Sequence, residues 1–332
     1  MSEMNVMLST LHLVYPPVSS YEADSVKVDP EVEALLRGSD FYVMAMRPEV
    51  VFDDQNIQID GAEWTVPVLG QTHGGKPIAD QVTLDIARFA SDLLGEEPES
   101  ITAEAGPKML RFWAGTMEDF EADQLEGPFE WFTTEKLLHD KGRGVDGITG
   151  LDRHRDLATY ELLYVGIAKK TDTFDRLFER AHHARQKILS GEWPRRSGAR
   201  VTDELILFPF RVEPTILRTL ELGDEPTDTT GEAWAQYKKQ VVADAEKAFV
   251  HLLDPQYNVE KFASYPKGAD GLYGGDHQRY GYLIAENVTF TTANGTMRGS
   301  FDPRLGMFDD SADWIFVSGD EVELVGPSQG DT

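Results

Sequence analysis

The chain has 332 residues, of which 58 are acidic and 31 are basic, so its formal net charge at pH 7 is −27. This surplus disfavours unassisted binding to nucleic acid or to an anionic membrane, because long-range repulsion lowers the rate of encounter. Any polyanionic partner would need a locally positive docking surface. The length and the 41% of hydrophobic residues suffice for two or three subdomains.

The chain contains no cysteine, which excludes disulfides and thiolate metal sites. Its start lacks a basic segment followed by a long apolar core, and no apolar run approaches the roughly 20 residues that a membrane-spanning helix needs. We therefore expect a soluble, cytoplasmic protein without a membrane partner.

Residues 1–124 are expected to form a β-rich domain with one or two helices. Three stretches read as strands, and the pair Asp60-Gly61 breaks an alternating pattern as a tight hairpin turn does. Residues 79–95 then repeat apolar side chains at helical spacing and end at a glycine, which predicts an amphipathic helix.

Residues 125–265 are expected to form a central α/β unit with a small mixed sheet flanked by helices. Within these bounds, the glycine-rich stretch KGRGVDGITG precedes the first clearly predicted strand and is typical of a loop. A basic loop separates the first helix from the second strand. The predicted order is strand 158–168, helix 172–190, strand 204–212 and helix 231–253.

Residues 266–332 are expected to form a small β-hairpin module with a polar tail. Two hairpin turns are predicted there, one at Asn294-Gly295 and one at 318–320. The fold class predicted for the whole chain is therefore α+β, with β-rich parts before and after the central unit.

Positive charge gathers in one part of this acidic chain. The window 151–200 contains eleven Lys and Arg against seven Asp and Glu, so it carries +4 of the total of −27 and leaves −31 elsewhere. On the helix predicted at 172–190, cationic side chains form a stripe about 120° from the apolar stripe. A solvated face that pairs with nearby carboxylates would explain this pattern without a ligand. The stripe consists of Arg176, Arg180, His183 and Lys187.

Two neighbouring segments change the interpretation of this stripe. A strand ends in Tyr164-Val165-Gly166 directly before the helix, and a later helix carries Glu246 and is followed by Asn258. The ordered set of Tyr-Val-Gly, arginine, histidine, glutamate and Pro-x-Tyr-Asn resembles the GIY-YIG nuclease superfamily. The resemblance covers roughly residues 125 to 265.

The resemblance implies hydrolysis of a phosphodiester bond in DNA or RNA, with Mg²⁺ or Mn²⁺ held by Glu246. Arg176 would brace the scissile phosphate, and His183 would position a phosphate or pass a proton. Tyr164 would orient or deprotonate the nucleophile, and deprotonation requires nearby cations to lower its pKa from about 10. Asn258 would fix the local backbone or the substrate. The nucleic-acid-binding surface would comprise Lys169, Lys170, Arg180, Lys187, Arg195, Arg196 and Arg200.

Each of these residues also has a purely structural explanation. Tyr164 could pack at a strand edge with a satisfied hydroxyl, and Glu246 lies off the apolar stripe of its helix. Asn258 could close a turn after the helix. His182 and His183 cannot chelate one metal together, because adjacent helical positions point about 100° apart.

One part of the family pattern is missing where it is expected. The family's first strand carries Gly-x-Tyr beside the second tyrosine, whereas the stretch from Gly127 has phenylalanine and Trp131 and no tyrosine. Tyr160 is predicted to face the same side of its strand as Tyr164, where it could substitute. Two functions therefore stay open. One is a metal-dependent nuclease, and the other is an inactive nuclease-like scaffold whose acidic flanks dock a basic protein partner or mimic nucleic acid.

Overall fold

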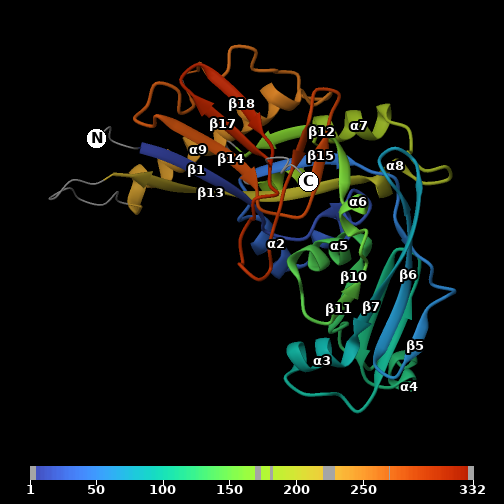
Figure 1. Ribbon diagram of the computed structural model, residues 1–332. Coiled ribbons are helices and arrows are strands. Elements are labelled where there is room, and N and C mark those ends of the chain that lie inside the picture. Colours follow the sequence, from blue (N-terminus) through green and yellow to red (C-terminus); the bar gives the residue numbers. More distant parts are fainter. Residues whose placement is uncertain (1–4, 169–172, 180–181, 220–228, 269, 328–332) are drawn as a thin grey trace, which may run out of the picture. The chain divides into compact units, whose positions relative to one another are not determined.

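The computed structural model describes residues 5–168, 173–179, 182–219, 229–268 and 270–327 (Figure 1). The chain divides into two compact units. Unit 1 comprises Met1–Arg47, Tyr160–Trp193 and Arg200–Thr332, and unit 2 comprises Pro48–Thr159 and Pro194–Ala199. This division differs from the three consecutive domains expected at 1–124, 125–265 and 266–332.

Unit 1 is built on one large sheet, which has ten strands within the described ranges. Nine strands follow one another across the sheet, and a short tenth strand, β2 (Val18–Ser19), pairs with the fifth strand of this order. The order is β16 (Thr296–Arg298), β15 (Thr289–Thr291), β12 (Thr159–Ile167), β3 (Phe41–Met46), β13 (Leu205–Arg218), β1 (Asn5–Leu13), β14 (Arg279–Ile284), β17 (Trp314–Ser318) and β18 (Glu321–Val325).

This sheet corrects the expectation of a small mixed sheet flanked by helices. β1 pairs with β13 in antiparallel and with β14 in parallel, so segments from the start, middle and end of the chain share one sheet. The two C-terminal hairpins are confirmed, but β17 pairs with β14 and so extends the large sheet. Alternating side chains identify a strand and its buried face, but they do not identify a distant partner strand.

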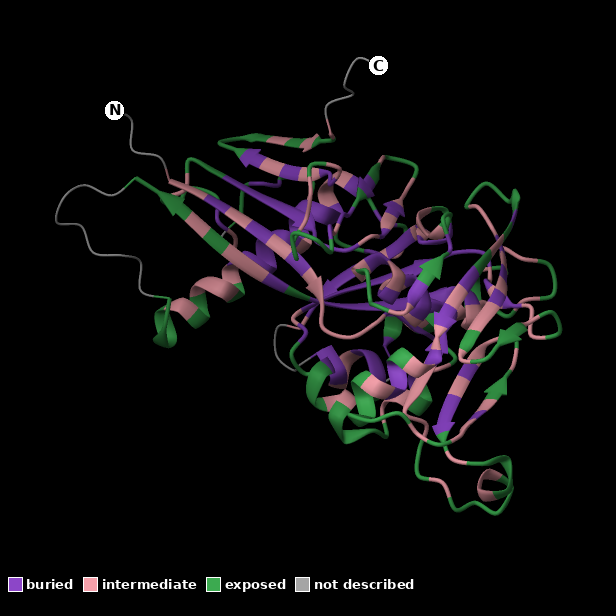
Figure 2. Ribbon diagram, turned by 60° about the horizontal axis from the view of Figure 1, so that its bottom comes forward, coloured by how far each residue is buried: buried purple, intermediate pink, exposed green. Residues whose placement is uncertain are grey.

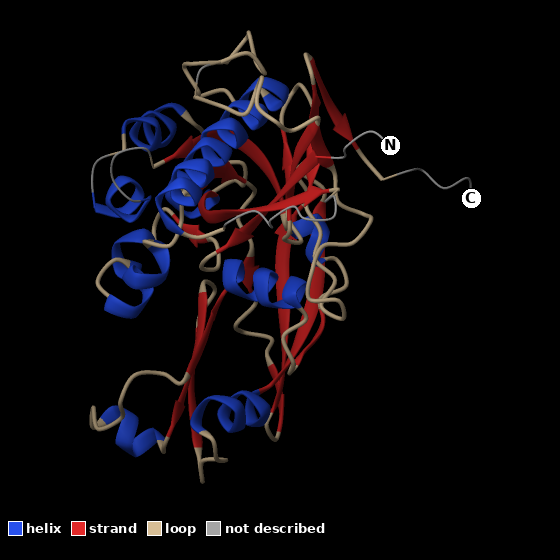
Figure 3. Cartoon of the chain, turned by 90° about the vertical axis from the view of Figure 1, so that its left-hand side faces the viewer, coloured by secondary structure: helices blue, strands red, loops and turns tan. Residues whose placement is uncertain are grey.

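Helices pack on both faces of the large sheet; helices are blue and the strands of both units are red in Figure 3. On one face the ring of Phe41 lies 5.4 Å from that of Phe249, which belongs to a long helix. Successive strand residues point to opposite faces, so Tyr42 faces the other side and joins a second apolar core. The helices of unit 1 are α1 (Ala23–Val26), α2 (Pro30–Leu36), the π-helix η1 (Asp175–Glu179), α7 (His183–Gly191), α8 (Val201–Glu204) and α9 (Gly231–Leu253).

The two helices predicted for the central part have different outcomes. The helix at 231–253 is confirmed as α9. The helix at 172–190 is replaced by η1 and α7, because His182 between them has an extended backbone with ψ 115°. In the described part of the chain, none of the helices combines the length and the apolar character that crossing a membrane requires.

Burial explains why the central strands read as continuous apolar runs. Every residue of β3 is buried, and the strands in the middle of the sheet are mostly purple in Figure 2. A strand covered on both faces has no solvent side on which polar residues are favoured. The single hydroxyl within β3, that of Tyr42, is therefore unusual in its surroundings.

Unit 2 contains two antiparallel sheets within its described residues. The first orders β11 (Ile148–Gly150), β7 (Pro77–Asp85), β6 (Glu63–Gln71) and β4 (Val51–Phe52), and β5 (Gln58–Asp60) also pairs with β6. The second orders β10 (Glu130–Thr133), β9 (Met109–Ala114) and β8 (Ile101–Ala105). The helices are α3 (Ile86–Leu94), α4 (Met117–Glu121), α5 (Thr134–Arg143) and α6 (His154–Leu157).

The predicted helix at 79–95 begins later than expected. Its first part is β7, and α3 starts after Asp85, whose side chain accepts a hydrogen bond from the backbone N–H of Arg88 at 3.0 Å. Gly95 ends the helix in the left-handed conformation, as predicted. The Asp60-Gly61 hairpin is also confirmed, between β5 and β6.

Candidate active site

Five of the six residues considered for catalysis line one cavity of unit 1, which has a volume of about 420 Å³. They come from β12, η1, α7, α9 and the segment that follows α9. These segments lie far apart in the chain, so folding brings the side chains together. The five residues are Tyr164, Arg176, His183, Glu246 and Asn258.

Tyr164 stacks on a tyrosine that sequence reasoning missed. Tyr42 lies on the adjacent strand β3, with the two ring centroids 6.1 Å apart and an interplanar angle of 27°. Gly166 is the register partner of Tyr42, and a Cβ at Gly166 would lie 2.6 Å from the Tyr42 ring. Only glycine therefore fits at this position, which explains why Tyr-Val-Gly occurs at this strand end.

The tyrosine beside Tyr164 was expected in the stretch from Gly127. That stretch instead contributes β10 to unit 2, where it pairs with β9. The pattern around Tyr42 is also altered, because Asp40 stands where Gly-x-Tyr would have its glycine. The sequence did show a tyrosine, Tyr42, in an otherwise apolar strand. It did not show that this strand pairs with the strand of Tyr164.

Tyr160 does not join the cavity. The register of β12 against β3 shifts by one residue between Leu162 and Tyr164. Such a bulge reverses which residues face a given side. Tyr160 is buried and packs edge-on against Phe208, with ring centroids 4.9 Å apart. The expectation that Tyr160 faces the same side as Tyr164 is therefore wrong.

His182, rather than His183, contacts the tyrosine pair. Its Nδ1 accepts a hydrogen bond from the backbone N–H of Arg185 at 3.3 Å and so caps α7. A neutral imidazole with an accepting Nδ1 carries its proton on Nε2, which lies 2.9 Å from the Tyr42 hydroxyl and donates to it. Burial, assisted by Arg176, lowers the pKa of His182 to about 4. His183 is exposed at the cavity.

The Tyr164 phenol keeps its proton at neutral pH. Burial raises its pKa, while Arg176 and a hydrogen bond from Tyr42 oppose this shift. Arg176 thus lowers the pKa of Tyr164, as expected of a nearby cation, but by less than burial raises it. Burial also raises the pKa of Tyr42. The hydrogen bonds from His182 to Tyr42 and from Tyr42 to Tyr164 therefore orient the Tyr164 hydroxyl. They do not deprotonate it.

Arg176 is held by the strand end and by the tyrosine pair. Its Nη1 donates to the carbonyl oxygen of Ile167 at 2.6 Å, and its guanidinium carbon lies 6.0 Å from the centroid of the Tyr42 ring. A guanidinium has five N–H groups, so this bond leaves donors for an anion in the cavity.

Asn258 fixes the backbone next to Tyr164. Its Nδ2 donates to the carbonyl oxygen of Val165 at 2.7 Å, and its Oδ1 accepts from the N–H of Val165 at 2.9 Å. Asn258 is buried, and the backbone N–H of Tyr257 donates to Leu163 on the same strand. Asn258 was expected to fix either the local backbone or the substrate, and the structure shows its contact with the backbone.

Glu246 brings a carboxylate to the cavity from α9, and Glu260 brings a second. Glu246 is half-buried and close enough to Tyr164 to raise the pKa of that phenol. Within the described ranges, no three His, Asp or Glu side chains gather as a complete metal cluster. Mg²⁺ needs only one or two protein carboxylates, because it usually keeps several waters. Glu246 therefore fits the ligand set of such a cation.

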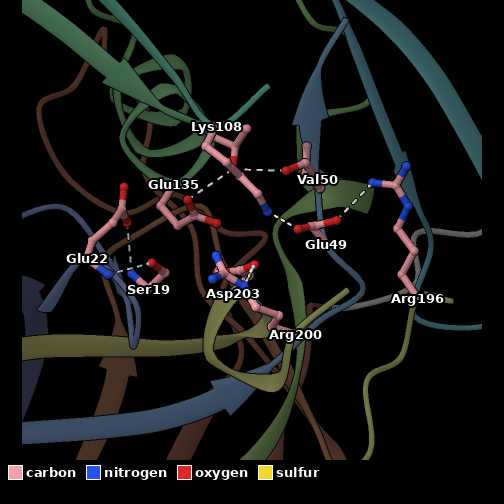
Figure 4. Close-up of polar contacts among 10 residues, drawn as sticks. Ser19, Glu22, Glu49, Val50, Lys108, Glu135, Arg196, Arg200 and Asp203 are labelled. Carbon is pink, nitrogen blue, oxygen red and sulfur yellow. Dashed lines mark hydrogen bonds and ion pairs between the residues drawn. The ribbon is translucent and has the colours of Figure 1, made fainter. Parts of the chain in front are cut away.

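The residues expected to bind nucleic acid are divided between the two units. Lys187 lines the cavity. Arg195 and Arg196 belong to unit 2, where Arg196 pairs with Glu49 at 3.2 Å and Glu49 also pairs with Lys108 (Figure 4). In unit 1, Arg200 pairs with Asp203 at 3.0 Å. The other three candidates, Lys169, Lys170 and Arg180, lie outside the described residues.

Comparison with known proteins provides no relative for this chain, since no family model, no curated protein and no solved structure matches it.

The buried His182 predicts a loss of stability in acid. Its folded pKa of about 4 lies below the ordinary value of 6.5, so the unfolded chain alone binds the proton between these values. This stabilisation is complete well above pH 6.5, and about 2.5 kcal/mol of unfolding free energy should be lost between pH 7.5 and pH 4.5. Urea unfolding of the wild type and His182→Asn at pH 7.5 and 4.5 measures this loss. Asparagine can still cap α7 but does not titrate, so equal losses in both proteins would contradict the prediction.

Proposed function

We propose that unit 1 is a metal-dependent nuclease that hydrolyses phosphodiester bonds of DNA or RNA at this cavity, with a site like that of the GIY-YIG superfamily. The observation that carries the proposal is the convergence on one cavity of Arg176, Glu246 and Tyr164, whose ring stacks on the buried Tyr42. Phosphoryl transfer needs an oriented nucleophile, donors for the phosphate oxygens and an anionic ligand for a cation. These three requirements match the three kinds of side chain at the cavity.

The cation is part of this proposal. A divalent ion, Mg²⁺ or Mn²⁺, supplies a Lewis acid and lowers the pKa of a bound water. Glu246 would hold it, and the open volume beside Glu246 leaves room for the waters that such an ion keeps.

The side chains of the cavity have separate tasks. Arg176 binds the scissile phosphate with a planar pair of donors and offsets the negative charge that develops during hydrolysis. Tyr164 stays protonated and orients the attacking water through its hydroxyl group. His183 and Lys187 lie at the same cavity and contact the phosphates of the bound strand.

The tyrosine pair also favours this function over an inactive scaffold that docks a basic protein partner. The scaffold hypothesis depended on the absence of a tyrosine beside Tyr164. Tyr42 supplies that tyrosine from β3.

Cleavage assays test the proposed activity directly. Purified protein is incubated with plasmid, single-stranded DNA or RNA in the presence of Mg²⁺, Mn²⁺ or a chelator. We expect cleavage with metal and none with chelator. Binding without cleavage of any substrate, with either metal, would support the inactive scaffold instead.

Lys187 should contribute to substrate affinity through its charge. We expect Lys187→Gln to weaken nucleic-acid binding several-fold and to lower the slope of log affinity against log salt by about 1. Fluorescence anisotropy at about 50 to 300 mM salt measures both the affinity and its salt dependence. A chelator in the buffer prevents cleavage during the measurement. Lys76→Gln is the matched control, because Lys76 is an exposed lysine of unit 2. If both variants behave alike, Lys187 makes no direct phosphate contact.

A further inference from the structure

Unit 1 has a second cavity, of about 540 Å³, which none of the proposed catalytic residues lines. It is bounded by the ends of β1 and β13, the first turns of α9 and the loop 271–277. Its volume falls within the roughly 300–1,000 Å³ that is usual for small-molecule sites. Tyr237 lines this cavity and Glu246 lines the other, and their spacing on α9 places them on opposite sides of the helix.

One wall of the second cavity is a pair of aromatic rings. Trp234 and Tyr237 both line it, with ring centroids 5.3 Å apart and an interplanar angle of 25°. Both residues are only partly buried. A ring pair of this kind offers a flat face on which a planar ligand can stack.

Hydrogen bonds hold this wall in place. Asn5 Nδ2 donates to the carbonyl oxygen of Asp276, which leaves Asn5 Oδ1 to accept from His277 Nδ1 at 3.0 Å. His277 Nε2 then accepts from the Tyr237 hydroxyl at 2.8 Å. The chain of bonds ties β1, α9 and the loop together. The aromatic wall is therefore organised before any ligand arrives.

The loop opposite the wall is also fixed, and it presents backbone. Its Gly271 packs against Asp244 so closely that a Cβ would lie 2.4 Å from Asp244 Oδ2. The N–H of Leu272 donates to the same carboxylate at 2.7 Å. Gly274 has a φ of +74°, which L side chains rarely adopt, and Gly275 follows it. A flat ligand can thus approach the loop backbone without meeting side chains at these glycines.

The cavity also contains groups suited to an anion. Arg218 lines it, as does Ala233 in the first turn of α9. The start of a 23-residue helix carries the positive end of its dipole. The amide of Gln240, also on the lining, can both donate and accept hydrogen bonds.

We propose that this second cavity binds a nucleotide, with its base stacked on Trp234 and Tyr237 and its phosphate near Arg218 and the first turn of α9. An aromatic platform beside a cation is the combination that binds bases without regard to sequence. This site goes beyond the proposed nuclease, since it uses none of the residues assigned to cleavage.

Binding of the four nucleoside 5′-monophosphates by isothermal titration calorimetry tests this site. We expect wild-type protein to bind them, and Trp234→Leu to weaken binding about 5- to 150-fold through the loss of stacking. Trp234→Phe should keep much of the affinity, and Arg218→Gln should weaken the monophosphate more than the free nucleoside. Trp193→Leu is the matched control, because Trp193 is 83% exposed and lines neither cavity.

The base could belong to a free nucleotide or to a nucleic-acid strand, and a single-stranded tetranucleotide separates these sources. Tighter binding of the tetranucleotide than of the mononucleotide, with the same loss in Trp234→Leu, indicates a strand. Weaker binding of the tetranucleotide indicates a free nucleotide. Either result supports a base site. The site is overturned if wild-type protein binds no monophosphate at millimolar concentration, or if folded Trp234→Leu binds as tightly as wild type. Glu246→Gln should leave this affinity unchanged, which separates failure of this site from failure of the nuclease.

Discussion

Glu246→Gln should lower the rate of metal-dependent cleavage by at least about three orders of magnitude, with little change in thermal stability. Glutamine keeps the shape of the side chain but removes the negative charge that a hard divalent cation requires. Glu246 is only half-buried, so the free energy of unfolding should change by no more than about 1 kcal/mol. Single-turnover cleavage at saturating metal and a thermal melt measure the two effects.

Glu260→Gln is the control for this substitution. Glu260 lines the same cavity and is exposed, so its replacement removes an equal charge from the same surroundings. We expect Glu260→Gln to cut within a few-fold of wild type, because it is not the proposed metal ligand. A Glu246→Gln protein that cuts as fast as wild type would show that the ligand lies elsewhere.

Arg176→Ala should reduce cleavage by about 10²- to 10⁴-fold and should also weaken substrate binding. The guanidinium is the only planar fork of donors on this cavity within the described residues. Arg176→Lys should restore binding in part but not cleavage, because an ammonium cannot form two parallel bonds to a phosphate. Cleavage rates at saturating substrate, together with anisotropy in chelator, separate the two losses.

The control for charge in this experiment is Arg304→Ala. Arg304 is an exposed arginine of unit 1 that does not line the cavity. If Arg176→Ala binds weakly but cuts at the wild-type rate once saturated, Arg176 contacts the substrate without stabilising the transition state.

Local patterns predicted the elements that carry strong periodicity and clear ends. The strand at 158–168 and the helix at 231–253 were found because each combines a regular apolar pattern with a defined end, which for α9 is Asp254 in the left-handed conformation. The break at His182 was not predicted. It depends on a hydrogen bond from this side chain to Tyr42, which a helical repeat does not reveal.

The residues of the cavity were also predicted only where the signal is local in the sequence. Arg176, Glu246 and Asn258 were predicted to lie together because their order along the chain resembles the motif order of the GIY-YIG superfamily. Tyr42 was missed because β3 and β12 are neighbours in the sheet but not in the sequence. Tyr160 was misplaced because a one-residue bulge cannot be read from residue spacing.

The position of unit 2 in the chain has a consequence for folding. Met46 and Glu161 are register partners on antiparallel strands, and the first and larger segment of unit 2 lies between them in the sequence. If unit 2 is unfolded, pairing these strands means closing a very long flexible loop, whereas a folded unit 2 restricts the distance between its ends. The tyrosine pair should therefore assemble late, after unit 2 is ordered. We therefore expect unit 2, which contributes no side chain to the cavity, to set how quickly the cavity forms.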